Sequence, residues 1–288
     1  MNVLVAGATG YLGRFLCAEY ARRGHHVTAL VRDARRAEGL ADVLIEAEAT
    51  RPDSLEGIMD GVDLVVSSLG ITRQADGLGY REVDFQADLN LLREAETAGV
   101  RRFAYIHVLK ADAMRGVPLV DAKAAFVDAL LASDMPATVI APTGYFSDMG
   151  EIFEMARRGR VWLFGDGTQR FNPIHGADLA VAVADATDAG RGWAEIGGPD
   201  VMTQDEIARA AFAALGTEPR IARLPDALRR AALSVMPIMP RRISGPARFF
   251  LTALGHDMVA PRFGTRRLSD HFATLAAEAA HHPSGAKK

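Results

Sequence analysis

Residues 2–16 read NVLVAGATGYLGRFL, a short apolar run followed at once by three glycines. The run NVLVA is typical of a buried strand, and from Leu12 onward apolar side chains recur at helical spacing. A glycine-rich motif gains weight when a strand precedes it and a helix follows it. This stretch therefore predicts a tight β-to-α turn whose uncovered backbone amides attract a phosphate group.

Each glycine has a separate predicted role in that turn. Gly7 permits the tight turn, Gly10 lets the backbone approach a pyrophosphate, and Gly13 lets the helix lie close to the sheet. A turn that binds no ligand can also contain glycines. The further β-α units in the chain favour the cofactor-binding interpretation.

Apolar runs of the same kind recur along the first half of the chain. They are HVTALV (26–31), DVLIEAE (42–48), VDLVVSSL (62–69), RFAYIHV (102–108) and ATVIAP (137–142). Consecutive apolar positions indicate strands that are buried on both faces, and helical patterns lie between them. The expected fold is therefore α/β, a doubly wound parallel sheet of the Rossmann type with right-handed crossovers.

The alternation of strands and helices changes after Pro142. We expect a dinucleotide-binding Rossmann core at residues 1–147. Residues 148–280 are expected to supply the remaining sheet segments and a smaller, mostly helical substrate lobe. The tail at 281–288, HHPSGAKK with His281, is expected to be disordered.

The composition is that of an average globular protein, with 49% hydrophobic and 24% charged residues. A net charge of −3 gives no reason to expect a nucleic acid or an anionic membrane as partner. The single cysteine, Cys17, supplies neither an internal disulfide nor a thiolate metal cluster, and no metal site is predicted. We find no secretion signal and no apolar run near the roughly 20 residues of a membrane span, so the cytoplasm is the expected compartment.

The turn GATGYLG, spaced Gly-x-x-Gly-x-x-Gly, resembles the nucleotide-binding turn of the short-chain dehydrogenase/reductase superfamily. The resemblance is closer to its atypical members, the NmrA-like (nitrogen-metabolite-repressor-like), isoflavone-reductase-like and divinyl-chlorophyllide-reductase-like proteins. Other segments follow in the order of that family: ALVRDARR, GVDLVVSSLG, VDFQADLNLLREAETAGVRRFAYIHVL, PTGYFSDM and NPIHGADLA. The resemblance covers most of residues 1–200 and, more weakly, 200–272.

This resemblance implies an NAD(P)-binding oxidoreductase with cofactor contacts from several strand ends. The implied cofactor-binding residues are Gly7, Thr9, Gly10, Tyr11, Leu12, Gly13, Arg32, Arg36, Ser68, Leu69, Gly70, Lys123, Pro142 and Thr143.

The end of the second strand indicates which dinucleotide binds. An acidic residue there favours NAD, whereas a basic one accommodates the 2′-phosphate of NADP. Arg32 ends this strand, and a guanidinium suits phosphate oxygens, so NADP(H) is favoured. Asp33 can turn toward the ribose, which keeps NAD(H) open, and Arg35 and Arg36 also fit the solvated start of a helix.

Ordinary members of the superfamily use a Tyr-x-x-x-Lys pair, whose spacing places both side chains on one helical face. Here the lysine corresponds to Lys123, Leu119 stands in place of the tyrosine, and His107 stands in place of the catalytic serine. In a first interpretation Lys123 positions the cofactor and His107 supplies or relays the proton. In a second, Lys123 only clamps the ribose and His107 is a structural strand residue. In a third, hydride moves to a carbon–carbon double bond, which needs no tyrosine.

Tyr145, in APTGYFSDM, is a further candidate proton donor, although Tyr145 and Phe146 also fit as core aromatics at the lobe junction. The catalytic candidates are thus Lys123, His107 and Tyr145.

We therefore expect an NADPH-dependent reductase that delivers hydride to a C=C or C=O bond of an apolar small molecule. The alternative is a non-catalytic NAD(P)-binding redox sensor or assembly factor. The stretch ALRRAALSVMPIMPRRISGPARFFLTALG (227–255) suits a hydrophobic substrate, a homodimer interface or peripheral membrane contact equally well.

Overall fold

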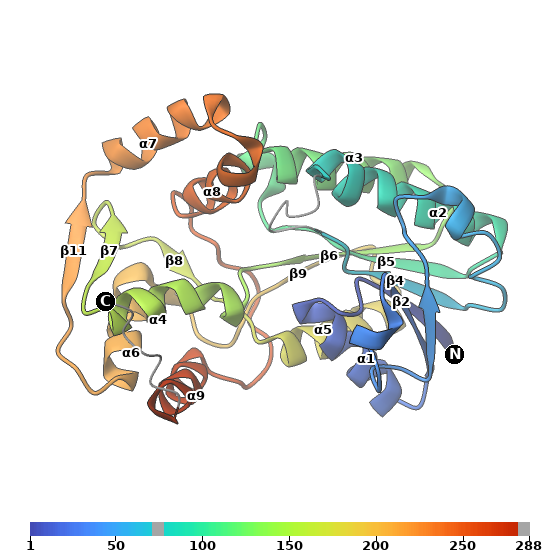
Figure 1. The fold of residues 1–288 in the computed structure, drawn as a ribbon, viewed down its shortest axis with the longest axis horizontal. Helices are drawn as coiled ribbons and strands as arrows, with labels where there is room; N and C mark the ends of the chain where they lie inside the picture. The colour runs from blue at the N-terminus through green and yellow to red at the C-terminus, as the bar shows by residue number, and fades with distance from the viewer. Residues whose placement is uncertain (71–77, 282–288) are drawn as a thin grey trace.

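The computed structural model describes residues 1–70 and 78–281, apart from the side chains of 241–243, and is built around a seven-stranded sheet (Figure 1). The strand order is β3-β2-β1-β4-β5-β6-β9, and every neighbouring pair is parallel. These strands are β1 (Asn2–Ala6), β2 (His26–Val31), β3 (Val43–Glu46), β4 (Leu64–Ser67), β5 (Arg102–Ile106), β6 (Ala137–Pro142) and β9 (Trp193–Ile196). The first six confirm the predicted strands, and β9 completes the edge beside β6.

Helices cover both faces of the sheet, as Figure 1 shows. One face carries α1 (Tyr11–Arg22) and α5 (Gly176–Asp188), and the other carries α2 (Asp88–Thr97) and α3 (Pro118–Ala132). Each pair closes a separate apolar cluster against the strands. In α1 the predicted apolar stripe is confirmed, since Leu12, Leu16 and Tyr20 are buried. The doubly wound α/β fold is thereby confirmed.

A second part follows β6 and lies at the left of Figure 1. Its strands are β7 (Val161–Phe164), β8 (Arg170–Phe171), β10 (Met202–Thr203) and β11 (Ile221–Leu224). Its helices are α4 (Gly150–Arg157), α6 (Gln204–Ala214), α7 (Asp226–Val235), α8 (Arg241–Ala253) and α9 (Leu268–His281). Strands β7 and β11 pair in parallel, β8 and β10 pair antiparallel, and a third apolar cluster fills this part. Between these elements, α5 and β9 return to the main sheet.

Three short turns matter for the site. They are the 3₁₀ turns η1 (Ala34–Arg36) and η6 (Met236–Ile238) and the π-helical turn η3 (Arg81–Ala87), which leads into α2.

Asn172 joins the second part to the end of β6. Its side chain is fully buried, donates to the carbonyls of Gly198 and Ala260, and accepts a hydrogen bond from the Ala260 amide. The Thr143 hydroxyl, just beyond β6, donates to the Asn172 carbonyl over 2.6 Å. These bonds hold the lobe next to the carboxyl edge of the sheet, where the site lies.

The predicted tail lies outside the described residues, apart from His281, which ends α9. In the part of the chain that the structure describes, no helix has both the length and the apolar character needed to cross a membrane. Within the same residues, no group of three or more His, Cys, Asp or Glu side chains is arranged to hold a metal ion.

Candidate functional site

The turn between β1 and α1 has no room for a side chain at two of its glycines. Gly7 has a φ of +77°, and a Cβ atom there would lie 2.9 Å from the Ser68 carbonyl. A Cβ atom on Gly13 would lie only 2.1 Å from the Gly7 carbonyl oxygen. Among the described residues, no side chain caps α1 and no acid stands in its first turn. The first amides of α1 are thus suited to an anionic group.

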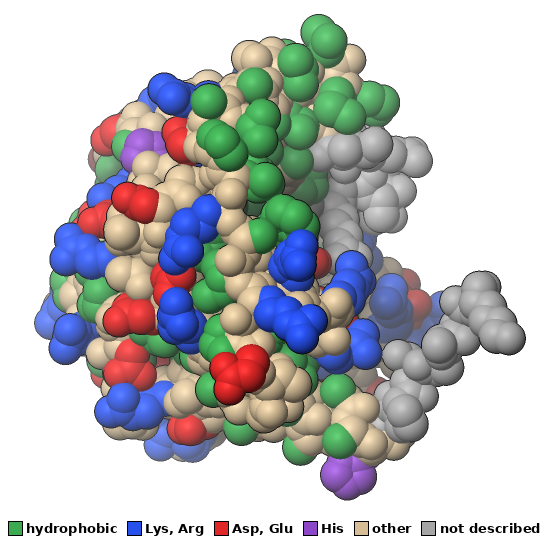
Figure 2. Space-filling view, turned by 90° about the vertical axis from the view of Figure 1, so that its left-hand side faces the viewer, with side chains coloured by type: hydrophobic (Ala, Val, Ile, Leu, Met, Phe, Trp, Pro, Cys, Tyr) green, Lys and Arg blue, Asp and Glu red, His purple; other side chains and the backbone are tan. Residues whose placement is uncertain are grey.

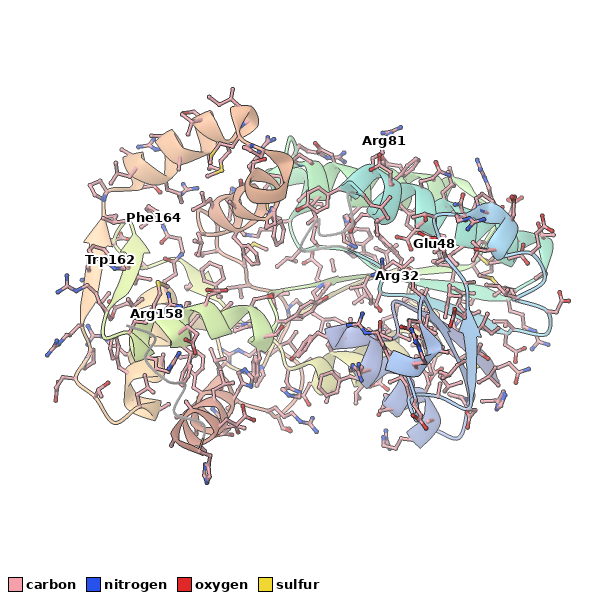
Figure 3. All side chains as sticks on the ribbon, viewed as in Figure 1. Arg32, Glu48, Arg81, Arg158, Trp162 and Phe164 are labelled. Atoms are coloured by element: carbon pink, nitrogen blue, oxygen red, sulfur yellow. The ribbon has the colours of Figure 1, made fainter. Side chains whose placement is uncertain are left out.

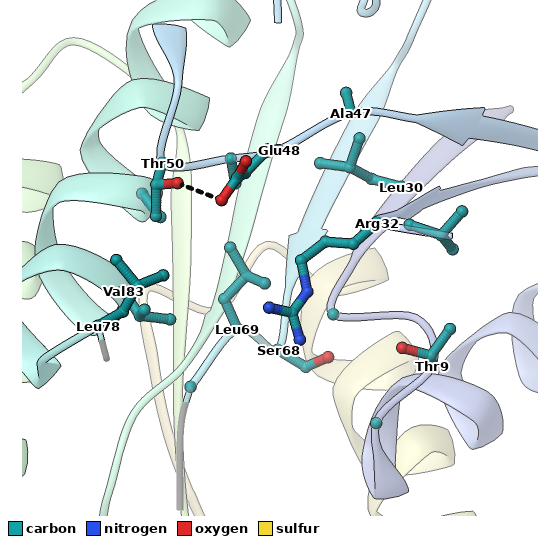
Figure 4. Close-up of a pocket in the computed structure, with 16 residues that line it drawn as sticks. Thr9, Leu30, Arg32, Ala47, Glu48, Thr50, Ser68, Leu69, Leu78 and Val83 are labelled. Carbon is teal, nitrogen blue, oxygen red and sulfur yellow. Dashed lines mark hydrogen bonds between the residues drawn. The ribbon is translucent and has the colours of Figure 1, made fainter. Parts of the chain in front are cut away.

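A cavity of about 270 Å³ opens beside this turn, at the carboxyl ends of the strands (Figure 4). It is lined by Gly7, Thr9, Gly10, Leu30, Val31, Arg32, Ala47, Glu48, Ala49, Thr50, Ser68, Leu69, Gly70, Leu78, Val83 and Ala87. The strand order reverses between β1 and β4, and doubly wound sheets bind nucleotides at such a point. The position of this first cavity is therefore the one that a dinucleotide needs.

Arg32 extends its guanidinium into the first cavity, toward Ser68 (Figure 4). Asp33, by contrast, accepts hydrogen bonds from the backbone amide and the guanidinium of Arg35, both over 3.1 Å. The Arg35 hydrogen bond lowers the pKa of Asp33. Asp33 is thus engaged at the start of η1, and Arg36 is not among the residues that line the cavity.

A second cavity, of about 350 Å³, adjoins the first and shares Gly10, Ser68, Leu69 and Gly70 with it. His107, Lys123, Tyr145 and Asp148 contribute its polar side chains, together with Asp84, Thr143 and Ser147. Its apolar wall includes Leu109, Leu119, Met149, Phe171, Phe249, Phe250, Ala253, Leu254 and Met258. One continuous crevice therefore leads from the glycine-rich turn to a mainly apolar chamber under the lobe.

Lys123, on α3, ties together the ends of two central strands. Its Nζ donates to the carbonyl of Leu69, beyond β4, and to that of Ile106 at the end of β5, each over 3.1 Å. It also lies 3.5 Å from Asp84 Oδ1, on η3, and both side chains are buried. Gly70 passes directly over this pair, because a Cβ there would meet Asp84 Oδ1 at 2.9 Å and Lys123 Nζ at 3.4 Å. The Lys123 ammonium thus holds the ends of β4 and β5 in place and also puts a positive charge at the floor of the crevice.

A second buried acid, Asp88, lies one helical turn after Asp84. It accepts a short hydrogen bond from the Ser67 hydroxyl, and burial raises its pKa to about 8. Asp88 is therefore mostly protonated at neutral pH, so the lysine compensates chiefly for Asp84.

This shift predicts a pH-dependent contribution of Asp88 to stability. The folded state keeps the Asp88 proton up to about pH 8, whereas the unfolded chain loses it near pH 4. Between these values the folded state binds more protons, so stability falls as the pH rises. Urea unfolding at about pH 5 and about pH 8 is expected to show this decrease, and Asp88→Asn is expected to flatten it. An unchanged slope in the variant would contradict the assignment.

His107 follows β5 and is almost fully buried in the wall of the second cavity. Among the described residues, its Nδ1 atom has no hydrogen-bond partner. Burial, and then the nearby Lys123 charge, lowers its pKa to about 3, so the ring is neutral at physiological pH. A neutral imidazole can orient a polar group by a hydrogen bond, but it holds no imidazolium proton to give.

Tyr145 lines the second cavity and packs against Tyr11, which also lines it. The centroids of the two rings are 5.6 Å apart. Burial raises the pKa of Tyr145, which keeps its phenol protonated. Its backbone amide donates to Asp148, whose own pKa burial also raises. The Tyr11 hydroxyl accepts a hydrogen bond from the Gly176 amide at the start of α5. Tyr145 is thus both a packed aromatic and a phenol at the cavity wall.

The structure brings together every predicted site residue except Arg36 along one of the two cavities. Asp84, Asp88 and the aromatic pair Phe249 and Phe250 were not predicted. The two acids stand four residues apart in VDFQADL, a spacing that places them on one helical face among apolar residues. That spacing is the signal that could have found them.

Comparisons with known proteins agree with this geometry. A family model described as NAD(P)H-binding matches residues 7–189. The chain is 27% identical to the photosystem II assembly factor Ycf39 of Synechocystis sp., over 80% of this chain and 72% of that protein. It is 29% identical to the chloroplastic divinyl chlorophyllide a 8-vinyl-reductase of Arabidopsis thaliana, over 78% of this chain. The alignment spans 60% of that reductase, less than two thirds of its length.

Among solved structures, the fold is similar to that of an NADPH-dependent quinone oxidoreductase from Escherichia coli in complex with NADPH. The TM-score is 0.76 and the identity 21%, over 95% of this chain and 99% of the other. At this identity the likeness supports the Rossmann-type fold.

Proposed function

Since the chain belongs to the NAD(P)H-binding family, within the atypical short-chain dehydrogenases/reductases, we propose that it is an NADPH-dependent reductase. It transfers hydride to a C=C or C=O bond of an apolar small molecule. The observation that carries this proposal is the continuous crevice, which joins a glycine-floored, Arg32-lined cavity to an apolar chamber. A protein that only bound a nucleotide would need the first cavity but not the second.

The residues of the first cavity fit a dinucleotide phosphate. The Gly7–Gly13 turn is a cradle that Cβ atoms would fill, and the uncapped start of α1 favours a pyrophosphate. Arg32 would hold the 2′-phosphate, Ser68–Gly70 would follow the adenosine side, and Lys123 would hold the nicotinamide ribose, with Pro142 and Thr143 beside the ring. When bound, NADPH supplies the hydride.

The side chains around the chamber favour reduction of a C=C bond. Leu119 cannot polarise a carbonyl oxygen, and the neutral His107 orients a polar substrate group rather than protonating it. Tyr145 keeps its proton at neutral pH, and it gives that proton only to a strongly basic centre, such as the carbanion left by hydride addition. Tyr145 or water is therefore the proton donor.

Arg32→Asp is expected to weaken NADPH binding by about 10- to 100-fold, because a charge-assisted phosphate contact is worth about 1.5–3 kcal/mol. NADH, which has no 2′-phosphate, is expected to lose about threefold or less. Fluorescence titration with both nucleotides measures the difference. Arg36→Ala is the matched control, since Arg36 does not line the cavity. Equal losses of NADPH and NADH affinity would refute the phosphate assignment.

The function is tested by offering the purified protein NADPH with a panel of enones, quinones and vinyl compounds. Oxidation of NADPH that depends on an acceptor supports the proposal. Tight NADPH binding without turnover on any acceptor would instead favour the second candidate.

That second candidate is a non-catalytic NAD(P)-binding redox sensor or assembly factor. Leu119 at the tyrosine position supports it, as does the similarity to the assembly factor Ycf39. In either case the cytoplasm is the compartment that we propose.

A further inference from the structure

Helix α7 and the turn η6 carry a row of apolar side chains at the surface. Leu228, Ala231, Val235 and Ile238 recur every three or four residues, so they follow one side of the helix and its extension. Leu228 and Val235 are 51% and 50% exposed, and Ile238 is 87% exposed. Among the described residues, α7 has no buried side chain. Figure 2 shows hydrophobic side chains gathered at the top of this face, where Figure 1 places α7.

Arginines accompany this apolar row. Between Ala227 and His256 the sequence contains five arginines and no acidic residue, although the whole chain has a net charge of −3. They are Arg229, Arg230, Arg241, Arg242 and Arg248. Asp226, the first residue of α7, pairs with Arg229 and Arg230, and the segment retains an excess of positive charge. Although the whole chain is slightly acidic, this segment is basic and apolar, and segments of this kind lie on anionic bilayers.

The same segment supplies a wall of the second cavity. Helix α8 follows η6, packs against α7, and places Phe249, Phe250 and Leu254 along the chamber. Phe250 is also 37% exposed, so it lies between the chamber and the surface. Helix α8 therefore connects the exposed apolar row of α7 and η6 with the wall of the chamber where we propose that the substrate binds.

Trp162 is an exposed aromatic side chain on β7, a strand that contacts α7. It is 47% exposed, and the Arg160 guanidinium lies over its ring, 5.5 Å from the centroid. Figure 3 shows Trp162 and Phe164 on β7, at the end of the molecule away from Arg32. Tryptophan favours the headgroup level of a bilayer, where its ring is apolar and its N–H stays solvated.

We propose that α7 and η6 bind the surface of an anionic lipid bilayer. The apolar row inserts among the acyl chains, and the positive charge of the segment attracts the anionic headgroups. The chamber then opens beside the bilayer next to Phe250, which suits an apolar substrate dissolved in lipid. This substrate class, unlike the docking itself, rests on the proposed reductase function.

Vesicle co-sedimentation of the full chain tests the docking. Vesicles of phosphatidylcholine containing roughly one third phosphatidylglycerol are compared with vesicles of phosphatidylcholine alone. Binding is expected to be at least about tenfold stronger to the anionic vesicles and to weaken as salt is added.

Two variants separate the apolar and the charged contributions. Ile238→Asp is expected to weaken binding by about tenfold or more, since it removes one inserted aliphatic side chain. Replacing Arg241 and Arg242 together by glutamate is expected to remove the preference for anionic vesicles. Leu131→Asp is the matched control, because Leu131 is 57% exposed and lies in the last turn of α3, at the opposite end of that helix from Leu119, which lines the second cavity. NADPH affinity is expected to be unchanged in all of these variants, which confirms that they fold.

The proposal is overturned if the protein does not bind either kind of vesicle, or if Ile238→Asp and Leu131→Asp bind equally well. It is also overturned if the protein sediments as a dimer that Ile238→Asp dissociates, since a second copy would then cover the row. Vesicle binding requires no turnover. A protein that docks but oxidises no NADPH would therefore refute the proposed function and leave the docking intact.

Discussion

Replacing Gly13 by alanine is expected to reduce NADPH affinity by at least about 100-fold, which corresponds to about 3 kcal/mol. The added Cβ would lie 2.1 Å from the Gly7 carbonyl oxygen and 2.7 Å from Ala8 Cα, and both are backbone atoms. Relief of this contact requires α1 to move away from the turn, which displaces the amides that face the pyrophosphate. The same overpacking is expected to destabilise the fold by about 3 kcal/mol.

Titration with NADPH and urea unfolding measure the two effects of Gly13→Ala separately. Gly192→Ala is the matched control, because a Cβ there meets nothing within 4 Å. It is expected to change neither the affinity nor the stability. If Gly13→Ala bound NADPH normally, the turn would not be the pyrophosphate site, and the case for a nucleotide-dependent enzyme would fail with it.

Lys123→Met is expected to lower the free energy of unfolding by about 3–5 kcal/mol, because it leaves the fully buried Asp84 without its cation. The substitution also removes the bonds that join the ends of β4 and β5 at the crevice floor. Turnover of NADPH is expected to fall by about 100-fold or more. Urea unfolding and steady-state kinetics with the best acceptor of the panel measure both effects.

A double variant separates the structural role of Lys123 from its role in the reaction. Lys123→Met combined with Asp84→Asn removes both charges, so most of the lost stability is expected to return. Turnover is expected to stay low, because the ammonium that we place at the nicotinamide ribose is still missing. Recovery of turnover together with stability would mean that Lys123 only supports the fold.

The predicted strands match the structure wherever a run of apolar residues is buried on both faces of the sheet. The runs from NVLVA to ATVIAP are apolar at consecutive positions, and the structure buries them between two layers of helices. Strand β9 has no such signature, because its four residues WAEI alternate between exposed and buried at the edge of the sheet. Its pairing with β6 depends on α5, which returns the chain from the lobe.

Some residues of the site could likewise be predicted from the sequence, and others could not. The glycines and Arg32 could be predicted because each follows directly from the end of a strand, and the carboxyl ends of parallel strands meet at one edge. In the sequence, the four-residue spacing of Asp84 and Asp88 places both acids on one helical face, but it does not show what packs against that face. Their burial arises because α3 packs against η3, and this burial raises the pKa of Asp88 even though the nearby Lys123 charge lowers it.

By itself, the sequence determined six of the seven strands of the main sheet, the glycine-rich turn and the basic residue at the end of the second strand, since each follows from the local order of residue types. Tertiary structure alone decided that Lys123 sits in a buried ion pair, that His107 is neutral, and that α8 closes an apolar chamber beside an exposed basic row. These features are set by which distant segments exclude water from one another, and burial of that kind is a property of the packed chain rather than of any stretch within it.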